Sequence, residues 1–200
     1  MENDLYRTLR TESRGLYKEK GSRFISVALP VTCTDEVRAE LEQLRREFHD
    51  ARHHCYAYRI GEPPYDIRYN DDGEPSGTAG KPIFGQIQSY DLTNALVVVI
   101  RYFGGIKLGT GGLIQAYKSA ARDSLENAVI ITKTWKIPIR IRFNYDKMNE
   151  VMRIVKEEHL DILRQDSSEK ILIDLEIRKG IIELVTRKLN SVESLEWTVI

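Results

Sequence analysis

The stretch RYFGGIKLGTGG, residues 101–112, places five of the chain's 13 glycines within twelve positions. It follows an apolar run at 95–100 and precedes residues 113–125, whose apolar spacing predicts a helix. The first amides of a helix lack partners within the helix, and the helix dipole favours negative charge there. Residues 109–112 are therefore a candidate anion site, to which Arg101 and Lys107 would add positive charge.

This glycine-rich loop departs from the two common phosphate-binding signatures. A P-loop needs Lys and then Ser or Thr directly after its last glycine, but Gly109 is followed by Thr110 and another glycine. The dinucleotide-binding pattern needs a third glycine at the position of Ile114. The alternative is that Gly104 and Gly105 only turn the chain, while the later glycines let a helix pack closely. The sequence leaves both interpretations open.

The histidines and cysteines do not match a common metal-binding pattern. His49 and His53 are four residues apart, but HDARH lacks the glutamate of a zinc-protease helix. In a strand, His53, His54 and Cys55 would alternate between two faces. We therefore expect no metal and no cofactor, and we regard His54, at the start of a predicted strand, as a candidate polar contact near the loops.

Carboxylates cluster in one polar segment. Asp71, Asp72 and Glu74 are able to support acid–base chemistry, but Asp-Asp-Gly is also ordinary turn sequence. No nucleophile with a partner base is recognisable from the spacing. This favours a binding protein over an enzyme.

A second candidate surface is basic. In KIPIRIRF, residues 136–143, isoleucines and Phe143 alternate with Lys136, Arg140 and Arg142. If helices cover the apolar side of this strand, the three cations form a stripe able to contact phosphates, or else a solvated face. The strand shows no aromatic side chain on its basic side, which an RNA-recognition sheet would use for stacking.

The composition limits the classes of function. The 200 residues hold 30 basic and 30 acidic side chains, so binding to nucleic acid through bulk charge is excluded and any such site is local. Cys33 and Cys55 do not form a disulfide framework, and no apolar run is long enough to span a bilayer. We expect a cytoplasmic protein with no membrane contact.

Periodicity predicts the elements that would position these residues. Strands are expected at 13–18, 22–30, 55–60 and 95–103, a helix starting at Thr34 as its cap, a polar loop at 61–77 and a short helix at 78–90. From 136 onward the predicted order is β-α-β-β-α-β, that of a ferredoxin-like domain. The sequence therefore predicts an α+β chain with domains at 1–134 and 135–200.

Three segments, in this order and at these distances, resemble the IMPACT/YigZ family. They are DARHHCYAYR at 50–59, DDGEPSGTAGKPI at 71–83 and RYFGGIKLGTGGLIQAY at 101–117, and SRFI at 22–25 fits the first strand of the family. The resemblance covers residues 1–130, and the second block is similar to the small C-terminal domain of bacterial members.

The resemblance implies a fold and a cellular setting. The first domain would be a split β-α-β fold with a left-handed crossover, similar to a ribosomal-protein domain and to domain IV of elongation factor G, and the second would be similar to domain V of that factor. Eukaryotic relatives damp a translation-initiation kinase with the help of an RWD domain. We expect no RWD domain in this chain and do not carry that role over.

The resulting hypothesis is a non-enzymatic regulator of translation that binds RNA or a ribosome-associated protein through the glycine-rich loop. The alternatives are an enzyme or sensor for a phosphorylated small molecule in the same cleft, and a protein–protein adaptor. The predicted binding residues are Arg101, Lys107, Gly109, Thr110, Gly111, Gly112, Lys81, Thr78 and His54, with Lys136, Arg140 and Arg142 as a secondary basic face.

Overall fold

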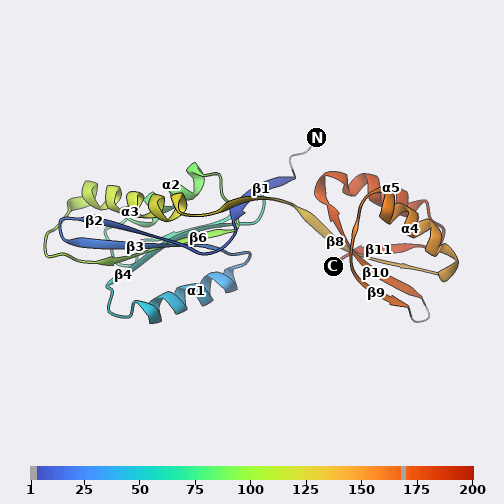
Figure 1. Cartoon of the computed structure of the whole chain (residues 1–200), viewed down its shortest axis with the longest axis horizontal. Helices are drawn as coiled ribbons and strands as arrows, with labels where there is room; N and C mark the ends of the chain where they lie inside the picture. The colour runs from blue at the N-terminus through green and yellow to red at the C-terminus, as the bar shows by residue number, and fades with distance from the viewer. Residues whose placement is uncertain (1–3, 168–169) are drawn as a thin grey trace. The chain divides into compact units, whose positions relative to one another are not determined.

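A computed structural model describes residues 4–167 and 170–200 and has a mixed α+β architecture (Figure 1). The chain divides into two compact units. One unit consists of residues 6–132, and the other combines residues 4 and 5 with residues 133–200. Each unit has its own hydrophobic core. In the part of the chain that the structure describes, no helix is both long and apolar enough to cross a membrane.

The first unit is built on a five-stranded sheet in the order β2-β3-β6-β4-β5. Neighbouring strands of this sheet are all antiparallel. The strands are β2 (Ser13–Glu19), β3 (Ser22–Pro30), β4 (His53–Ile60), β5 (Asp66–Asn70) and β6 (Ala95–Tyr102). The unbroken apolar run of β6 is explained by its central place, because both faces of this strand are covered.

Helices cover both faces of this sheet (Figure 1). The first helix, α1 (Thr34–Glu47), buries its predicted stripe of Val37, Leu41 and Leu44 against one face. The opposite face is covered by α2 (Gly80–Ser89) and α3 (Gly109–Glu126). On α3 the buried residues include the small side chains that the sequence pattern predicted, namely Ala116, Ala120 and Ser124. Small side chains let this long helix lie close to the sheet.

A separate two-stranded sheet pairs β1 (Leu5–Leu9) with β7 (Ile130–Thr134). The sequence patterns did not predict β1. Its backbone also contacts the segment before β6, where the amide of Thr93 donates to the carbonyl of Arg7 at 3.0 Å.

The second unit has the element order β8-α4-β9-β10-α5-β11 and the sheet order β11-β8-β10-β9. All neighbouring strands are antiparallel, as in a split βαβ arrangement. The elements are β8 (Lys136–Phe143), α4 (Met148–Glu157), β9 (Asp161–Ser167), β10 (Ile171–Arg178), α5 (Ile182–Asn190) and β11 (Glu196–Val199), and short 3-10 turns at Tyr145–Lys147 and Lys179–Ile181 precede the helices. The apolar side of β8 packs with both helices, as the alternation predicted.

Two local predictions were wrong. The polar stretch 61–77 is not all loop, because β5 lies within it and pairs with β4 along five residues. Pairing to an edge of the sheet supplied the backbone partners that the local sequence did not reveal. Thr34 is the first residue of α1 and not its cap, since Cys33 holds the capping position without a side-chain hydrogen bond.

Candidate functional site

A cleft of about 410 Å³ opens in the first unit, where β4 begins, β6 ends and α3 starts. Its wall also includes the loop that precedes α2. The lining residues are Arg52, His53, Glu74, Pro75, Arg101, Phe103, Lys107, Leu108, Gly109, Thr110 and Leu113. Three of these side chains are cations, namely Arg52, Arg101 and Lys107, and one, Glu74, is a carboxylate.

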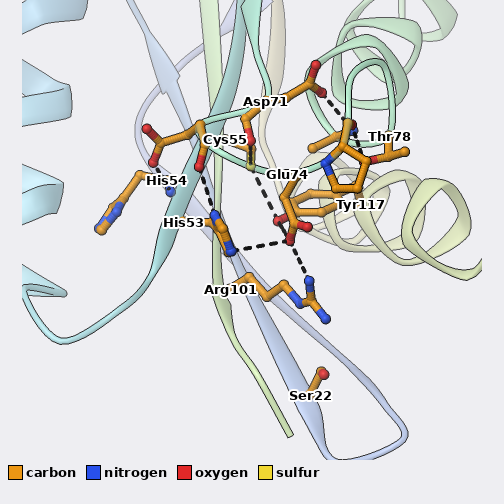
Figure 2. Close-up of polar contacts among 12 residues, drawn as sticks. Ser22, His53, His54, Cys55, Asp71, Glu74, Thr78, Arg101 and Tyr117 are labelled. Atoms are coloured by element: carbon orange, nitrogen blue, oxygen red, sulfur yellow. Dashed lines mark hydrogen bonds and ion pairs between the residues drawn. The ribbon is translucent and has the colours of Figure 1, made fainter. Parts of the chain in front are cut away.

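Glu74 is the centre of the polar network in this cleft (Figure 2). Its side chain is 4% exposed, and its Oε1 accepts hydrogen bonds from Tyr117 Oη at 2.8 Å and from Arg101 Nη1 at 2.5 Å. The charge of the buried carboxylate is thus paired with a guanidinium, which offsets the cost of its desolvation. The two donors hold the carboxylate in one orientation.

Arg101 has unused donor capacity next to the cleft. The residue is 6% exposed, and its Nε has no hydrogen-bond partner among the described residues. Its guanidinium lies 5.4 Å from the ring centre of Phe24 and 5.6 Å from that of Phe103. An arginine carries five N–H donors, and this unpaired one is itself buried, so it is a desolvated donor that no group of the described protein satisfies.

His53 lines the same cleft from the first position of β4. Its Nδ1 lies 2.7 Å from the backbone oxygen of Asp72. A carbonyl only accepts, so Nδ1 carries the proton and Nε2 is the nitrogen nearer Glu74, at 3.9 Å from Oε1. His54 follows in the strand and points away from this network (Figure 2).

Two buried side chains beneath the network stay protonated. Cys55 Sγ donates to the backbone oxygen of Asp71 at 3.0 Å and lies 3.3 Å from Tyr117 Oη. Burial raises the pKa of the Cys55 thiol and of the Tyr117 phenol, and the nearby Glu74 carboxylate adds to both shifts. Because the thiolate is the nucleophilic form of cysteine, Cys55 is a structural residue at neutral pH.

The other carboxylates of the loop bind the protein's own backbone. Asp71 accepts from the amides of Gly77, Ala79 and Gly80 at 2.8 to 2.9 Å, which caps the start of α2. Asp72 accepts from the amide of His54 at 2.7 Å. Among the described residues, no group of three or more His, Cys, Asp or Glu side chains is placed to hold a metal ion.

The glycines of the loop have different roles. A Cβ on Gly104 would lie 1.9 Å from the backbone of Gly21, so Gly104 allows the loop to pass over the β2–β3 turn. A Cβ on Gly111 would meet nothing within 4 Å. The proposal that the later glycines serve close packing is therefore wrong for Gly111, which lies exposed in the first turn of α3.

The structure brings together only part of the predicted binding set. Arg101, Lys107, Gly109 and Thr110 line the cleft, and Gly111 and Gly112 follow in the first turn of α3. The remaining predicted residues are Thr78, Lys81 and His54, none of which is among the lining residues. Thr78 is buried and donates to Pro75 O, Lys81 is exposed in the first turn of α2, and His54 is buried on the other face of β4.

The predicted secondary basic face is not a positive stripe. Lys136 Nζ lies 2.7 Å from Asp161 and 3.0 Å from Glu176, and Arg140 forms two hydrogen bonds with Asp174. Arg142 is opposite Glu196 in the register of β8 and β11. The neighbouring strands therefore supply acidic partners for Lys136 and Arg140, which the sequence of one strand does not reveal.

Sequence reasoning did not place all parts of the cleft together. Glu74, Phe103, Arg52 and His53 all line it. Glu74 was considered only as an acid–base carboxylate and His53 only as a metal ligand, and Phe103 and Arg52 were not among the predicted binding residues. Alternation along β4 predicts the side of the sheet on which His53 lies. His53 and Cys55 are two residues apart and share the face that α3 covers. The position of Glu74 in the cleft has no such signal, because Glu74 lies in the loop between β5 and α2, where no periodicity assigns a face.

The comparisons agree with this architecture. A model of the Impact N-terminal domain family matches residues 20–125. An IMPACT family member of Haemophilus influenzae is 33% identical over 177 residues, 88% of this chain and 86% of the relative. IMPACT family member YigZ of Escherichia coli is 33% identical over 156 residues, 77% and 76% of the two chains. A crystal structure of a hypothetical protein is similar with a TM-score of 0.74 at 29% identity, over 98% of each chain. The chain therefore belongs to the IMPACT family.

Proposed function

We propose that this protein binds RNA of the translation machinery and that its cleft holds one nucleotide of the RNA strand. The observation that carries the proposal is the charge of the cleft, where Arg52, Arg101 and Lys107 face one carboxylate, Glu74. Since the whole chain has no net charge, this concentration of cations is local and matches what an RNA backbone requires.

The phosphate would contact the start of α3. The Leu108 side chain does not cap this helix, and Gly109 and Thr110 line the cleft. Glycine is unfavourable inside a helix, and Gly111 has no packing neighbour that requires it. Bare backbone at this place would let a phosphate oxygen approach the amides directly, with Lys107 as its counter-charge.

The base would stack on Phe103. This side chain is 51% exposed and lines the cleft beside the cations. An exposed phenyl ring next to arginines is what single-stranded RNA uses for stacking. The cleft volume of about 410 Å³ suits one nucleotide, so an RNA strand would cross the cleft and not enter it lengthwise.

The setting in translation is supported by membership of the IMPACT family. The role is a binding one, because the buried thiol is protonated and the loop carboxylates Asp71 and Asp72 are engaged with backbone amides. Covalent catalysis would need a free nucleophile with a partner base, and the described cleft residues do not supply this pair.

The test is the affinity of purified protein for a labelled single-stranded RNA, measured by fluorescence anisotropy at several salt concentrations. Affinity should fall steeply with salt, and Lys107→Ala should weaken binding and reduce the slope of log K against log salt by about 0.7. Lys118→Ala is the matched control, because Lys118 is exposed on α3 but is not among the residues lining the cleft.

Equal loss of affinity in the Lys107 and Lys118 variants would contradict the use of this cleft. Binding of phosphorylated small molecules without any binding of RNA would instead favour a sensor of such a ligand. Crosslinking in cells, with sequencing of the bound RNA in wild type and Lys107→Ala, would identify the natural RNA.

A further inference from the structure

A row of three side chains crosses the end of the five-stranded sheet next to the cleft. Lys18, Arg23 and Tyr102 are opposite one another in the register of β2, β3 and β6, so they share one face of the sheet, the face that α1 covers farther along. Lys18 and Arg23 are exposed, and neither forms a salt bridge among the described residues. Because neighbouring strands are about 4.8 Å apart, the row extends over about 10 Å.

Arg23 is held in an orientation that suits contact with an anion. Its guanidinium lies 4.9 Å from the ring centre of Tyr102. The ring is held in turn, because Tyr102 Oη donates a hydrogen bond of 2.7 Å to Asp50. A guanidinium that stacks on an aromatic ring keeps the N–H groups at its edge available for a phosphate. The stacking also reduces the freedom that the arginine side chain loses when it binds a ligand.

The charge along the row is positive. Asp50 is the carboxylate that contacts the row, and the hydrogen bond from Tyr102 holds the pKa of Asp50 below its usual range. Asp50 is therefore ionised at neutral pH and offsets one cation. Glu19 follows Lys18 in β2, but alternation places it on the opposite face of the sheet, the face that α3 covers. Lys18 and Arg23 together outweigh Asp50.

The row begins where the cleft ends. Tyr102 lies between Arg101 and Phe103, which both line the cleft. Alternation places Arg101 on the α3 side of the sheet and Tyr102 on the α1 side, so a strand that passes from the cleft to the row bends around the end of β6. The β2–β3 turn also contacts the glycine-rich loop, because the Gly104 amide donates to Ser22 Oγ at 3.1 Å. The residue after Ser22 belongs to the row.

We propose that Arg23, held on the ring of Tyr102, binds the phosphate of the nucleotide next to the one in the cleft. Lys18 extends this contact, so the RNA strand runs from the cleft around the end of β6 to the β2–β3 hairpin. The inference rests on the proposed function and defines the path of the strand across the protein. Because phosphate contacts position a nucleic acid without reading its bases, the row adds affinity and no base selectivity.

The experiment compares a probe that reaches the row with one that does not. Labelled oligo(U) of eight nucleotides covers the cleft and the row and is measured by fluorescence anisotropy. Uridine 5′-monophosphate fills only the cleft and is followed by NMR chemical-shift titration. Arg23→Ala should weaken octamer binding about tenfold, the effect of one charge-assisted contact, and reduce the salt slope by about 0.7. Its affinity for the monophosphate should not change, whereas Lys107→Ala should weaken binding of both probes.

Two further variants and a control sharpen the test. Lys18→Ala should weaken octamer binding less than Arg23→Ala does. Asp50→Asn keeps an acceptor for Tyr102 and removes the negative charge, so octamer affinity should rise by up to about fivefold, the range of an exposed charge pair. Arg38→Ala is the control, because Arg38 is exposed on α1 near the other end of β3, and it should alter neither affinity.

The outcomes separate this inference from the proposed function. If Arg23→Ala binds the octamer like wild type while Lys107→Ala weakens it, the row is not used, so this inference is overturned and the proposed function stands. If Arg23→Ala loses affinity for both probes equally while its circular dichroism matches wild type, Arg23 acts on the cleft itself and the inference is also overturned. If wild type binds neither probe, the proposed function fails and this inference fails with it.

Discussion

At the scale of single residues, the two adjacent histidines of β4 have opposite environments. His53 faces the cleft and is held by a carbonyl, whereas His54 is 6% exposed and its Nε2 has no hydrogen-bond partner among the described residues. Burial lowers the pKa of His54 below its ordinary value of 6.5, although the nearby Asp72 carboxylate opposes the shift. Two adjacent histidines thus give one side chain that faces the cleft and one whose burial lowers the stability of the fold at acid pH.

A pH dependence of stability follows from His54. As pH falls toward and below 6.5, the unfolded chain takes up a proton on this ring while the folded chain does not, so the folded state loses stability. Asparagine at position 54 does not titrate. The stability deficit of His54→Asn relative to wild type should therefore shrink between about pH 7.5 and about pH 5, as measured by urea unfolding.

The control for this measurement is Gln43→Asn, because Gln43 is exposed on α1 and neither side chain titrates. Its difference from wild type should stay constant over the same pH range. A deficit of His54→Asn that is independent of pH would show that the ring is protonated equally in the folded and unfolded states.

At the scale of elements, the segment from the end of β6 to the first turn of α3 contains glycines with two different structural roles. Gly104 must be glycine because the backbone of the β2–β3 turn fills the space of a side chain. Its amide also donates to Ser22 Oγ at 3.1 Å. Gly111 has no such constraint, since it lies in a helical first turn with open space around it.

Alanine substitution should separate these roles. Gly104→Ala should lower the free energy of unfolding by about 3 kcal/mol or more, because the methyl group meets backbone that is fixed by a hairpin. Gly111→Ala should raise it by up to about 1 kcal/mol, the difference in helix propensity. Chemical denaturation of both variants is the measurement. Equal destabilisation would mean that the glycines serve a single packing role.

At the scale of the whole molecule, the N-terminal residues contribute to the unit at the other end of the chain. Asp4 is buried, and its carboxylate accepts from Arg178 at 3.1 and 3.2 Å and from the amide of Gly180 at 3.3 Å. The hydrogen bonds from Arg178 hold the pKa of Asp4 below its usual range. The backbone oxygen of Asp4 also accepts from the amide of Trp135.

Because each unit has its own core, thermal unfolding should show two transitions in calorimetry. Asp4→Asn should lower the midpoint of the transition that belongs to residues 133–200 and leave the other midpoint unchanged. The exposed Asp35, replaced in the same way, is the control. A single transition that shifts as a whole would contradict the independence of the two units.

The sequence by itself determined most of the elements of this protein. Alternation placed β8, the apolar run placed β6, and the stripes of Val37, Leu41 and Leu44 placed the buried side of α1. These patterns are local, because a side chain's face is decided by the period of its own helix or strand. Gly109 to Gly112 and the two nearby cations were predicted as an anion site for another local reason, because the first amides of a helix have no partners within the helix.

Only the tertiary structure decided what the loop faces. His53, Arg101 and Glu74 meet at one point, although they lie on β4, on β6 and in the loop before α2, respectively. It also decided that Lys136 and Arg140 are paired with carboxylates of β9 and β10, which removed the predicted basic stripe. Charge pairing and cleft formation depend on distances between segments far apart in the sequence, and no periodicity within one segment encodes those distances.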